Sequence, residues 1–120
     1  MNYHNKSLGA YGEKIACDFL KENHFIVLKK NYCTYWGEID IIAEKDHCLH
    51  FVEVKTRKSL HYGAPELAVT AKKQEVIKKC ALSFIQADGD RFQSFCFDVI
   101  AIFITSDYQS KIRFIENAFT

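Results

Sequence analysis

The sequence predicts an α/β protein in which a mixed central sheet of about five strands is flanked by helices. Two segments carry apolar side chains at helical spacing, and five short runs are rich in β-branched or aromatic residues. Their order, one helix, three strands, a helix and two strands, is typical of such a sheet. The 120 residues, 48% of them hydrophobic, contain no linker-like stretch, so a single domain spanning 1–120 is expected.

The helices are predicted from their apolar stripes. The first runs from Ser7 to Asn23, with Ser7 as its N-cap, and the second from Thr70 to Ala87, with Gly89 helping to stop it. The residues that form the stripes are Ile15, Ala16, Phe19 and Leu20 in the first helix, and Val76, Ile77, Cys80, Ala81, Phe84 and Ile85 in the second.

Five strands follow from the remaining apolar runs. They are predicted at Phe25 to Lys30, Glu38 to Glu44, Cys48 to Lys55, Phe95 to Ile104 and Lys111 to Ile115. The second and third are short and close enough to form a hairpin. A tip at Lys45 and Asp46 would place Asp40 opposite Phe51. Alternation then predicts one face with Asp40, Phe51, Glu53 and Lys55, and the other face with Ile39, Ile41, Val52 and Val54.

Composition excludes several classes of protein. The longest apolar run, Val99 to Thr105, is far shorter than a membrane span of roughly 18 residues, and Met1 to Gly9 is too polar for a signal peptide. No membrane partner is therefore expected. The cysteines are an odd number without any close pair, which predicts reduced thiols in a cytoplasmic protein and no zinc site. They are Cys17, Cys33, Cys48, Cys80 and Cys96.

Positive charge is concentrated in the middle of the chain. The net charge is only +1, but residues 55–79 hold seven Lys and Arg against two acidic residues. This segment is interpreted either as a nucleic-acid contact or as a solvated face. It includes the long connection from Thr56 to Val69, which is expected to form a substrate-facing flap or, alternatively, a packed helical turn at Pro65 to Val69.

The predicted hairpin brings together the residues with the clearest chemistry. Asp40 and Glu53 would be neighbours, and two carboxylates at short range resist joint ionisation unless a cation lies between them. Oxygen ligands select a hard ion, Mg²⁺ or Mn²⁺, and Lys55 on the same face would hold an attacking water or stabilise a phosphate. These are the requirements of phosphodiester hydrolysis. The alternative is a salt bridge between Asp40 and Lys55, with Glu53 solvated.

The ordered motifs of the chain resemble a known family. The motif Gly37-Glu38-Ile39-Asp40-Ile41-Ile42 is followed by Phe51-Val52-Glu53-Val54-Lys55-Thr56-Arg57, with twelve residues between Asp40 and Glu53. Together with Gly12-Glu13, Asn31-Tyr32, Lys73-Gln74 and Phe97-Asp98-Val99, this set resembles the YraN family of bacterial proteins, within the PD-(D/E)xK nuclease superfamily. The resemblance covers nearly the whole chain.

The resemblance implies a restriction-endonuclease-like fold and assigns roles to particular residues. Asp40, Glu53 and the Val54 carbonyl would hold the metal, Lys55 would be the catalytic lysine, and Glu13 an auxiliary acid. Two positions where family members often carry arginine are cysteines here, Cys33 and Cys96, which weakens the expected phosphate contacts.

Further side chains are candidates for contacts to DNA. Gln74 and Lys73 would reach the metal-bound water or a phosphate from a helix N-terminus, or else form ordinary helix surface. Tyr35 and Trp36 would stack on bases or close an edge of the core. The residues expected to contact nucleic acid are Arg57, Lys58, Lys72 and Lys73.

Two classes of function are weighed against each other, with a third behind them. The first is a metal-dependent endonuclease that hydrolyses DNA, with branched DNA as a candidate substrate. The second is a nucleic-acid-binding protein that keeps the fold without cleaving, and the third is a docking module for another protein. By analogy with the related resolvases, a homodimer is a candidate assembly.

Overall fold

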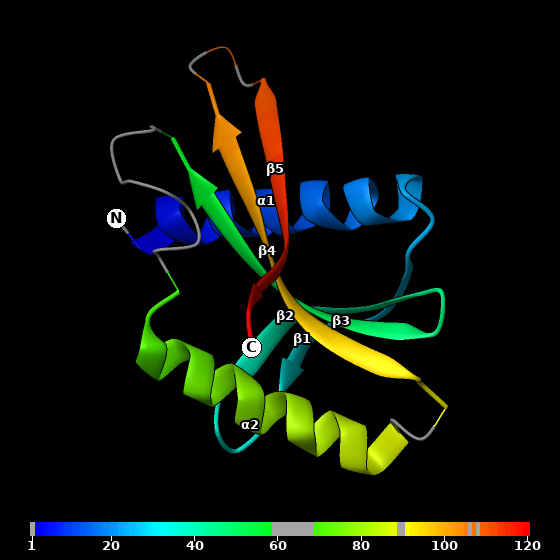
Figure 1. Ribbon diagram of the computed structural model, residues 1–120. Helices are drawn as coiled ribbons and strands as arrows, with labels where there is room; N and C mark the ends of the chain where they lie inside the picture. The colour runs from blue at the N-terminus through cyan, green and yellow to red at the C-terminus, as the bar shows by residue number, and fades with distance from the viewer. Residues whose placement is uncertain (1, 59–68, 89–90, 106, 108) are drawn as a thin grey trace.

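The computed structural model describes residues 2–58, 69–88, 91–105, 107 and 109–120, with side chains described from residue 8 onward. The described part of the chain forms one helix, three strands, a second helix and two strands, in that order (Figure 1). They are α1 (Asn2–Glu22), β1 (Ile26–Cys33), β2 (Glu38–Lys45), β3 (Cys48–Arg57), α2 (Ala71–Asp88), β4 (Ser94–Ile104) and β5 (Ser110–Phe119). Each predicted element is present, and the α/β class with a mixed sheet and flanking helices is confirmed.

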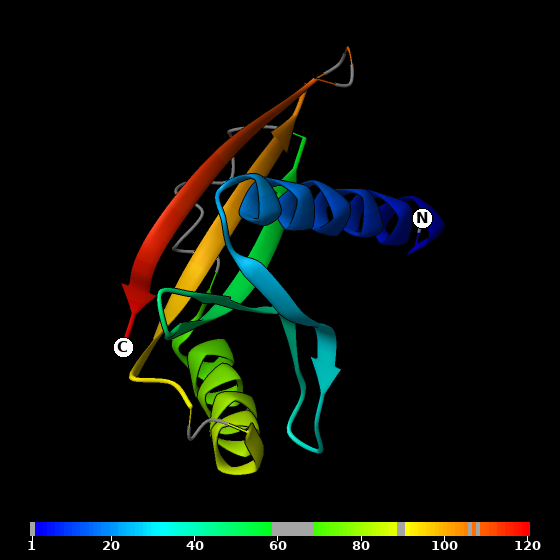
Figure 2. The same ribbon diagram turned by 90° about the vertical axis from the view of Figure 1, so that its right-hand side faces the viewer.

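The strands lie in the sheet in the order β1-β2-β3-β4-β5. Only β3 and β4 pair in parallel, and the other neighbours are antiparallel, so the sheet is mixed. A parallel pair requires a crossover connection, which here contains α2. The two views show a twisted sheet with α1 passing behind the strands and α2 in front of β1 and β2 (Figures 1 and 2).

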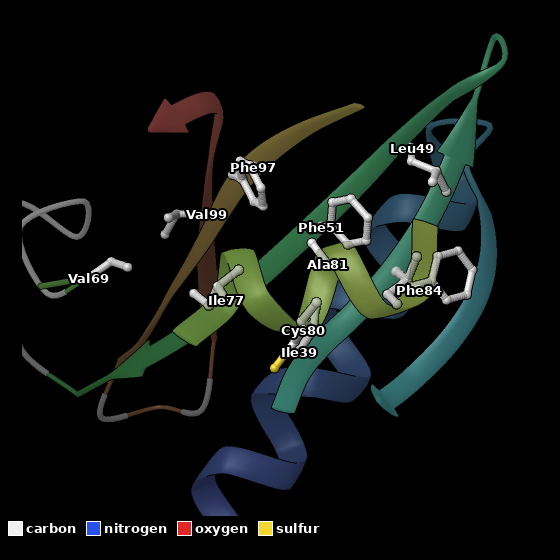
Figure 3. Close-up of a cluster of buried hydrophobic side chains, with 11 residues drawn as sticks. Ile39, Leu49, Phe51, Val69, Ile77, Cys80, Ala81, Phe84, Phe97 and Val99 are labelled. Carbon is white, nitrogen blue, oxygen red and sulfur yellow. The ribbon is translucent and has the colours of Figure 1, made fainter. Parts of the chain in front are cut away.

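Each helix buries its apolar stripe against a different face of the sheet. Under α2, Ile77, Cys80 and Phe84 pack on Phe51 and Val99 (Figure 3). The α1 side forms a separate cluster, whose fully or nearly buried members are Ala16, Cys17, Leu20, Phe25, Ile41, Ala43, Val52, Ile100, Ile102 and Ile104. Neither helix, over the part of the chain that the structure describes, is long and apolar enough to cross a membrane.

The start of α1 differs from the prediction. The helix begins at Asn2, so Ser7 lies inside it and is not the N-cap. Residues 2–6 contain neither proline nor glycine, and nothing in the backbone therefore stops the helix from extending by more than a turn. The second helix ends at Asp88, and the predicted stop at Gly89 lies outside the described residues.

The register of the hairpin also differs from the prediction, by two residues. Lys45 pairs with Cys48, so the turn consists of Asp46 and His47, and both have positive φ, 52° and 64°. A two-residue turn of this kind matches the twist of the flanking strands, and aspartate tolerates the left-handed conformation it needs. Phe51 consequently faces Ile42 rather than Asp40. A shift of two leaves the faces of β3 unchanged.

One residue of β2 is on the opposite face from the one predicted. Ile39 packs in the α2-side cluster with Phe51, whereas Ile41 and Val52 lie in the α1-side cluster. The pairing of β2 with β3 ends at Ile41, while pairing with β1 continues through Ile39 and Tyr32. Because β2 separates from β3 at this point, alternation along β2 no longer follows the faces of β3.

Candidate active site

The candidate site lies where β2 separates from β3. The last pair between them joins Ile41 to Val52, so Asp40 and Glu53 are the first residues beyond the paired region. The Asp40 Oδ2 atom accepts a hydrogen bond of 2.8 Å from the Val54 backbone N–H. A side chain of β2 thus takes the place of a backbone acceptor, and this bond fixes the Asp40 carboxylate beside Glu53.

Glu53 is a buried carboxylate with ammonium groups on one side. Its side chain is 5% exposed, and its Oε2 atom lies 3.4 Å from Lys55 Nζ and 3.8 Å from Lys73 Nζ. Its other oxygen, Oε1, is buried and has no hydrogen-bond partner among the described residues. The alternative in which Asp40 pairs with Lys55 and Glu53 is solvated is therefore wrong.

Burial raises the pKa of both carboxyl groups, and the Asp40 charge adds to the shift at Glu53. For Glu53, burial is the larger cause and the Asp40 charge the second, and together they raise the pKa from 4.5 to about 7 despite the two lysines. Burial also raises the pKa of Asp40, against the bond from Val54 N–H. Strongly shifted acids of this kind concentrate at functional sites.

The helix α1 brings Glu13 to the same region. A Cβ atom on Gly12 would lie 1.8 Å from Thr56 Oγ1, so only glycine allows α1 to cross β3 this closely. Burial and then the Asp40 charge raise the pKa of Glu13, so its carboxyl group lies within electrostatic range of Asp40. Glu13, Val54 and residues 55–57 line a pocket of about 410 Å³.

The N-terminus of α2 supplies Lys73 but uses Gln74 differently from the prediction. Thr70 caps the helix by accepting a hydrogen bond of 3.2 Å from the Lys73 N–H. The Gln74 Nε2 group donates to the Val69 carbonyl at 3.1 Å, so its amide nitrogen holds the entry to the helix. Lys73 reaches Glu53, a contact that the sequence did not predict.

The remaining candidates lie around this centre with different exposure. Lys58 and Lys72 are exposed, and Arg57 is half-buried with Nη1 donating to the Thr56 carbonyl at 3.1 Å. Tyr35 is 93% exposed and Trp36 52% exposed, so these aromatic rings do not close the core. Residues 59–68, which include most of the expected flap and its helical alternative, lie outside the described part.

The Lys79 ammonium lies 4.6 Å from the centre of the Trp36 ring, and the Tyr35 and Trp36 rings meet edge to face at 5.2 Å. The arrangement combines an exposed aromatic surface with positive charge, which are the two features of single-strand binding surfaces.

The residues present fit a hard divalent cation. Two carboxylates converge with raised pKa values, one of their oxygens is buried without a partner in the described structure, and a cation would relieve both costs. The side-chain atoms of Asp40 and Glu53 that would bind the ion are all carboxylate oxygens, which are ligands that Mg²⁺ and Mn²⁺ prefer. The donors predicted from the sequence are thus brought together, while the role of the Val54 carbonyl stays a prediction.

A second group of reactive side chains was missed at the sequence level. Cys48, His50 and Cys96 offer ligand atoms that lie within 4.8 Å of one another, and Asp98 contacts His50. The absence of closely spaced cysteines argued against such a group. The sequence does carry a signal for this group. Cys48 and His50 are two residues apart, as are Cys96 and Asp98, and residues two apart on a strand lie on the same face.

Comparisons with known proteins give the chain a family. The model of the uncharacterised protein family UPF0102 matches residues 12–102. A UPF0102 protein of Syntrophomonas wolfei subsp. wolfei is 41% identical over 96% of this chain and 99% of its own length. A UPF0102 protein of Geobacter metallireducens is 44% identical over 99% of this chain and 97% of its own length. A UPF0102 protein of Clostridium botulinum strain Kyoto is 43% identical over 99% of this chain and 98% of its own length. The sequence resemblance is thereby confirmed, and the chain belongs to the UPF0102, or YraN, family.

Proposed function

We propose that this protein is a metal-dependent endonuclease that hydrolyses phosphodiester bonds in DNA. The observation that carries the proposal is the Glu53 carboxylate, which is buried beside Asp40 with one oxygen lacking any partner in the described structure. A fold gains no stability from such an arrangement, because an unpaired buried carboxylate oxygen is costly. Function explains why the arrangement is present.

Asp40 and Glu53 would hold a Mg²⁺ or Mn²⁺ ion, with the Val54 carbonyl as a further ligand. A bound ion of this type would neutralise charge on the scissile phosphate and make water a better nucleophile. Val54 N–H keeps the Asp40 carboxylate in position at 2.8 Å. Asp40 and Glu53 are thereby held as a pair before any substrate arrives.

Lys55 and Lys73 provide positive charge at the same carboxylate. Lys55 is 22% exposed and points from the strand face that carries Glu53, so its ammonium group would orient the attacking water or stabilise charge developing on the phosphate. Lys73 comes from α2 and approaches the same Glu53 oxygen as Lys55 does. Glu13, on α1 within electrostatic range of Asp40, would act as an auxiliary acid or base.

The surroundings favour DNA as the substrate. Lys58 and Lys72 extend positive charge from the ends of β3 and α2, and exposed charges of this kind bind phosphates without reading sequence. Tyr35 and Trp36 offer rings on which unpaired bases would stack. Branched DNA presents both duplex backbone and unstacked bases, and it is therefore the substrate form to test first.

Cleavage of labelled branched, flapped and single-stranded DNA with Mg²⁺ or Mn²⁺ tests the proposal. Asp40→Asn and Glu53→Gln should each reduce cleavage about 10²-fold or more, and Lys55→Met by a similar factor, since each removes charge at the reacting phosphate. Glu75→Gln is the matched control, because the Glu75 side chain is 70% exposed on α2. Equal cleavage by wild type and by the Asp40 and Glu53 variants would refute the assignment.

A non-cleaving DNA-binding protein is the competing function, favoured by the cysteines Cys33 and Cys96. Cys33 Sγ donates to Glu38 at 3.5 Å and Cys96 Sγ to Asp98 at 3.3 Å, so both thiols are directed at carboxylates. Neither position offers an arginine for phosphate. Salt-dependent DNA binding without metal-dependent turnover would establish this second function in place of the first.

A further inference from the structure

A cluster of thiol and imidazole groups lies away from the carboxylate site. Cys48 and His50 lie at the start of β3, which begins at Cys48, and Cys96 and Asp98 lie near the start of β4, which begins at Ser94. The parallel register places His50 directly beside Cys96. The His50 ring packs edge to face on Phe25 of the α1-side cluster, at 4.9 Å between ring centres. Glu53, by contrast, contacts Lys73 of α2, so the two groups occupy opposite faces of the sheet.

The distances within the cluster are those of groups that could share one ion. Ligand atoms of Cys48, His50 and Cys96 all lie within 4.8 Å of one another. His50 Nδ1 is 3.1 Å from Cys96 Sγ and 2.6 Å from Asp98 Oδ2. Two sulfurs and one imidazole from adjacent strands match a common set of zinc ligands.

Asp98 holds His50 in place. It is fully buried at 0% exposure, and it accepts hydrogen bonds from the Asn117 backbone N–H at 3.0 Å and from Cys96 Sγ at 3.3 Å. Its second oxygen contacts His50. With Nδ1 hydrogen-bonded to Asp98, the ring would bind an ion through Nε2. A carboxylate on the other ring nitrogen fixes the orientation of a ligating histidine and makes it a stronger ligand.

The electrostatics of the cluster favour a cation. The buried Asp98 carboxylate contacts both His50 and Cys96, which places a negative charge beside two of the ligand side chains. A metal ion would offset that charge and allow the thiol to release its proton. Each of the two thiols would lose one proton on binding, and the ion would replace them.

The cluster is also accessible. Cys48, His50 and Cys96 line a pocket of about 610 Å³, together with Lys45, Asp46, Ser94 and aromatic rings of neighbouring strands. An ion can therefore enter from solvent, and a water molecule can take a fourth position on the pocket side. Cys48 and Cys96 are both half-buried free thiols, so neither is committed to a disulfide.

We infer that Cys48, His50 and Cys96 form a binding site for a thiophilic transition-metal ion of the Zn²⁺ type, positioned by Asp98 and separate from the carboxylate pair. The site joins β3 to β4 at the end where β3 begins. Hard ions such as Mg²⁺ bind poorly to thiolates, so the two sites would take different metals.

Spectroscopy with Co²⁺ alone, on the full reduced chain, tests the site directly. One equivalent should produce thiolate-to-cobalt charge-transfer absorption, which a carboxylate site cannot give, and Zn²⁺ should displace it. Cys48→Ser and Cys96→Ser should each lose most of this absorption, whereas Cys33→Ser should keep it, because Cys33 lies outside the cluster. Asp40→Asn should also keep it, so the result does not depend on the proposed nuclease site.

Asp98→Asn separates positioning from ligation. It should bind Co²⁺ with the same charge-transfer absorption but about 10- to 100-fold more weakly, as expected when the carboxylate partner of a ligating histidine is lost. Loss of the absorption altogether, in a variant that remains folded, would make Asp98 a ligand and overturn its positioning role.

Protection of thiols in the wild-type protein gives a result even if variants fail to fold. Zn²⁺ should slow alkylation of Cys48 and Cys96, identified by mass spectrometry, and leave the exposed Cys33 unaffected. Apparent affinity should fall on acidification, because two protons compete with the ion. Equal alkylation with and without Zn²⁺, or an oxidised Cys48–Cys96 pair whose reduced form binds no Co²⁺, would overturn the inference.

Discussion

Removing the charge of Glu53 should stabilise the metal-free protein at neutral and alkaline pH. In the folded state the pKa of Glu53 is about 7 rather than 4.5. Between these values the folded protein keeps a proton that the unfolded chain has released. The free energy of unfolding therefore falls as pH rises through this window, by up to about 3 kcal/mol when fully past it. Well below pH 4.5 Glu53 is protonated in both states, so it causes no destabilisation there.

Urea unfolding in EDTA at pH 5 and pH 8 measures this effect. Glu53→Gln mimics the protonated acid, so it should be more stable than wild type at pH 8 by up to about 3 kcal/mol and nearly equal to it at pH 5. Glu75→Gln, at a side chain 70% exposed, should not change the dependence. A wild-type protein whose stability does not fall over this range, or a Glu53→Gln protein less stable than wild type at pH 8, would refute the reasoning.

Metal should reverse the same effect in the wild type. At the proposed site Mn²⁺ would bind only when both carboxylates are ionised, so its stabilisation of the folded protein should grow between pH 5 and pH 8. The Glu53→Gln variant should show little stabilisation at either pH. The comparison links the stability measurement to the metal site without requiring any cleavage assay.

Two further predictions concern the close crossing of α1 and the DNA surface. Gly12→Ala should destabilise the protein by about 1–3 kcal/mol in urea unfolding, because the added methyl meets Thr56, whereas Gly9→Ala has open space around it and should stabilise by up to about 1 kcal/mol. Equal effects would show that α1 does not cross β3 closely. Trp36→Ala should weaken single-stranded DNA binding with an unchanged salt slope, whereas Lys58→Ala should lower the slope, as titrations in increasing salt would show.

Much of the fold was predictable because its signals are local. The apolar stripes of the helices and the β-branched runs of the strands depend on neighbours within a few residues, and all seven elements were predicted. The largest differences in bounds are that α1 begins at Asn2 rather than Ser7 and that β5 ends at Phe119 rather than Ile115. The face shared by Glu53 and Lys55 followed from alternation along a single strand. That face is confirmed by the contact between the two side chains at 3.4 Å.

The errors arose where the outcome depends on contacts between elements. The position of Ile39 is set by where β2 stops pairing with β3, which the sequence of either strand alone does not reveal. Lys73 reaches Glu53 from α2, and Cys96 reaches His50 from β4. Both contacts join residues far apart in the chain, and only the packing of the elements determines them.

The separation of β2 from β3 accounts for the position of Ile39, and it also creates the candidate site. Continued pairing would have left no gap in which Asp40 could accept the Val54 N–H at 2.8 Å. The carboxylate therefore has a structural role, satisfying a backbone donor, as well as its proposed role at the metal. Asp40→Ala would leave that donor without its acceptor, at a cost of about 1–3 kcal/mol. Asp40→Asn retains an oxygen at the same place, and it is therefore the variant in which loss of cleavage reports on chemistry rather than on a weakened fold.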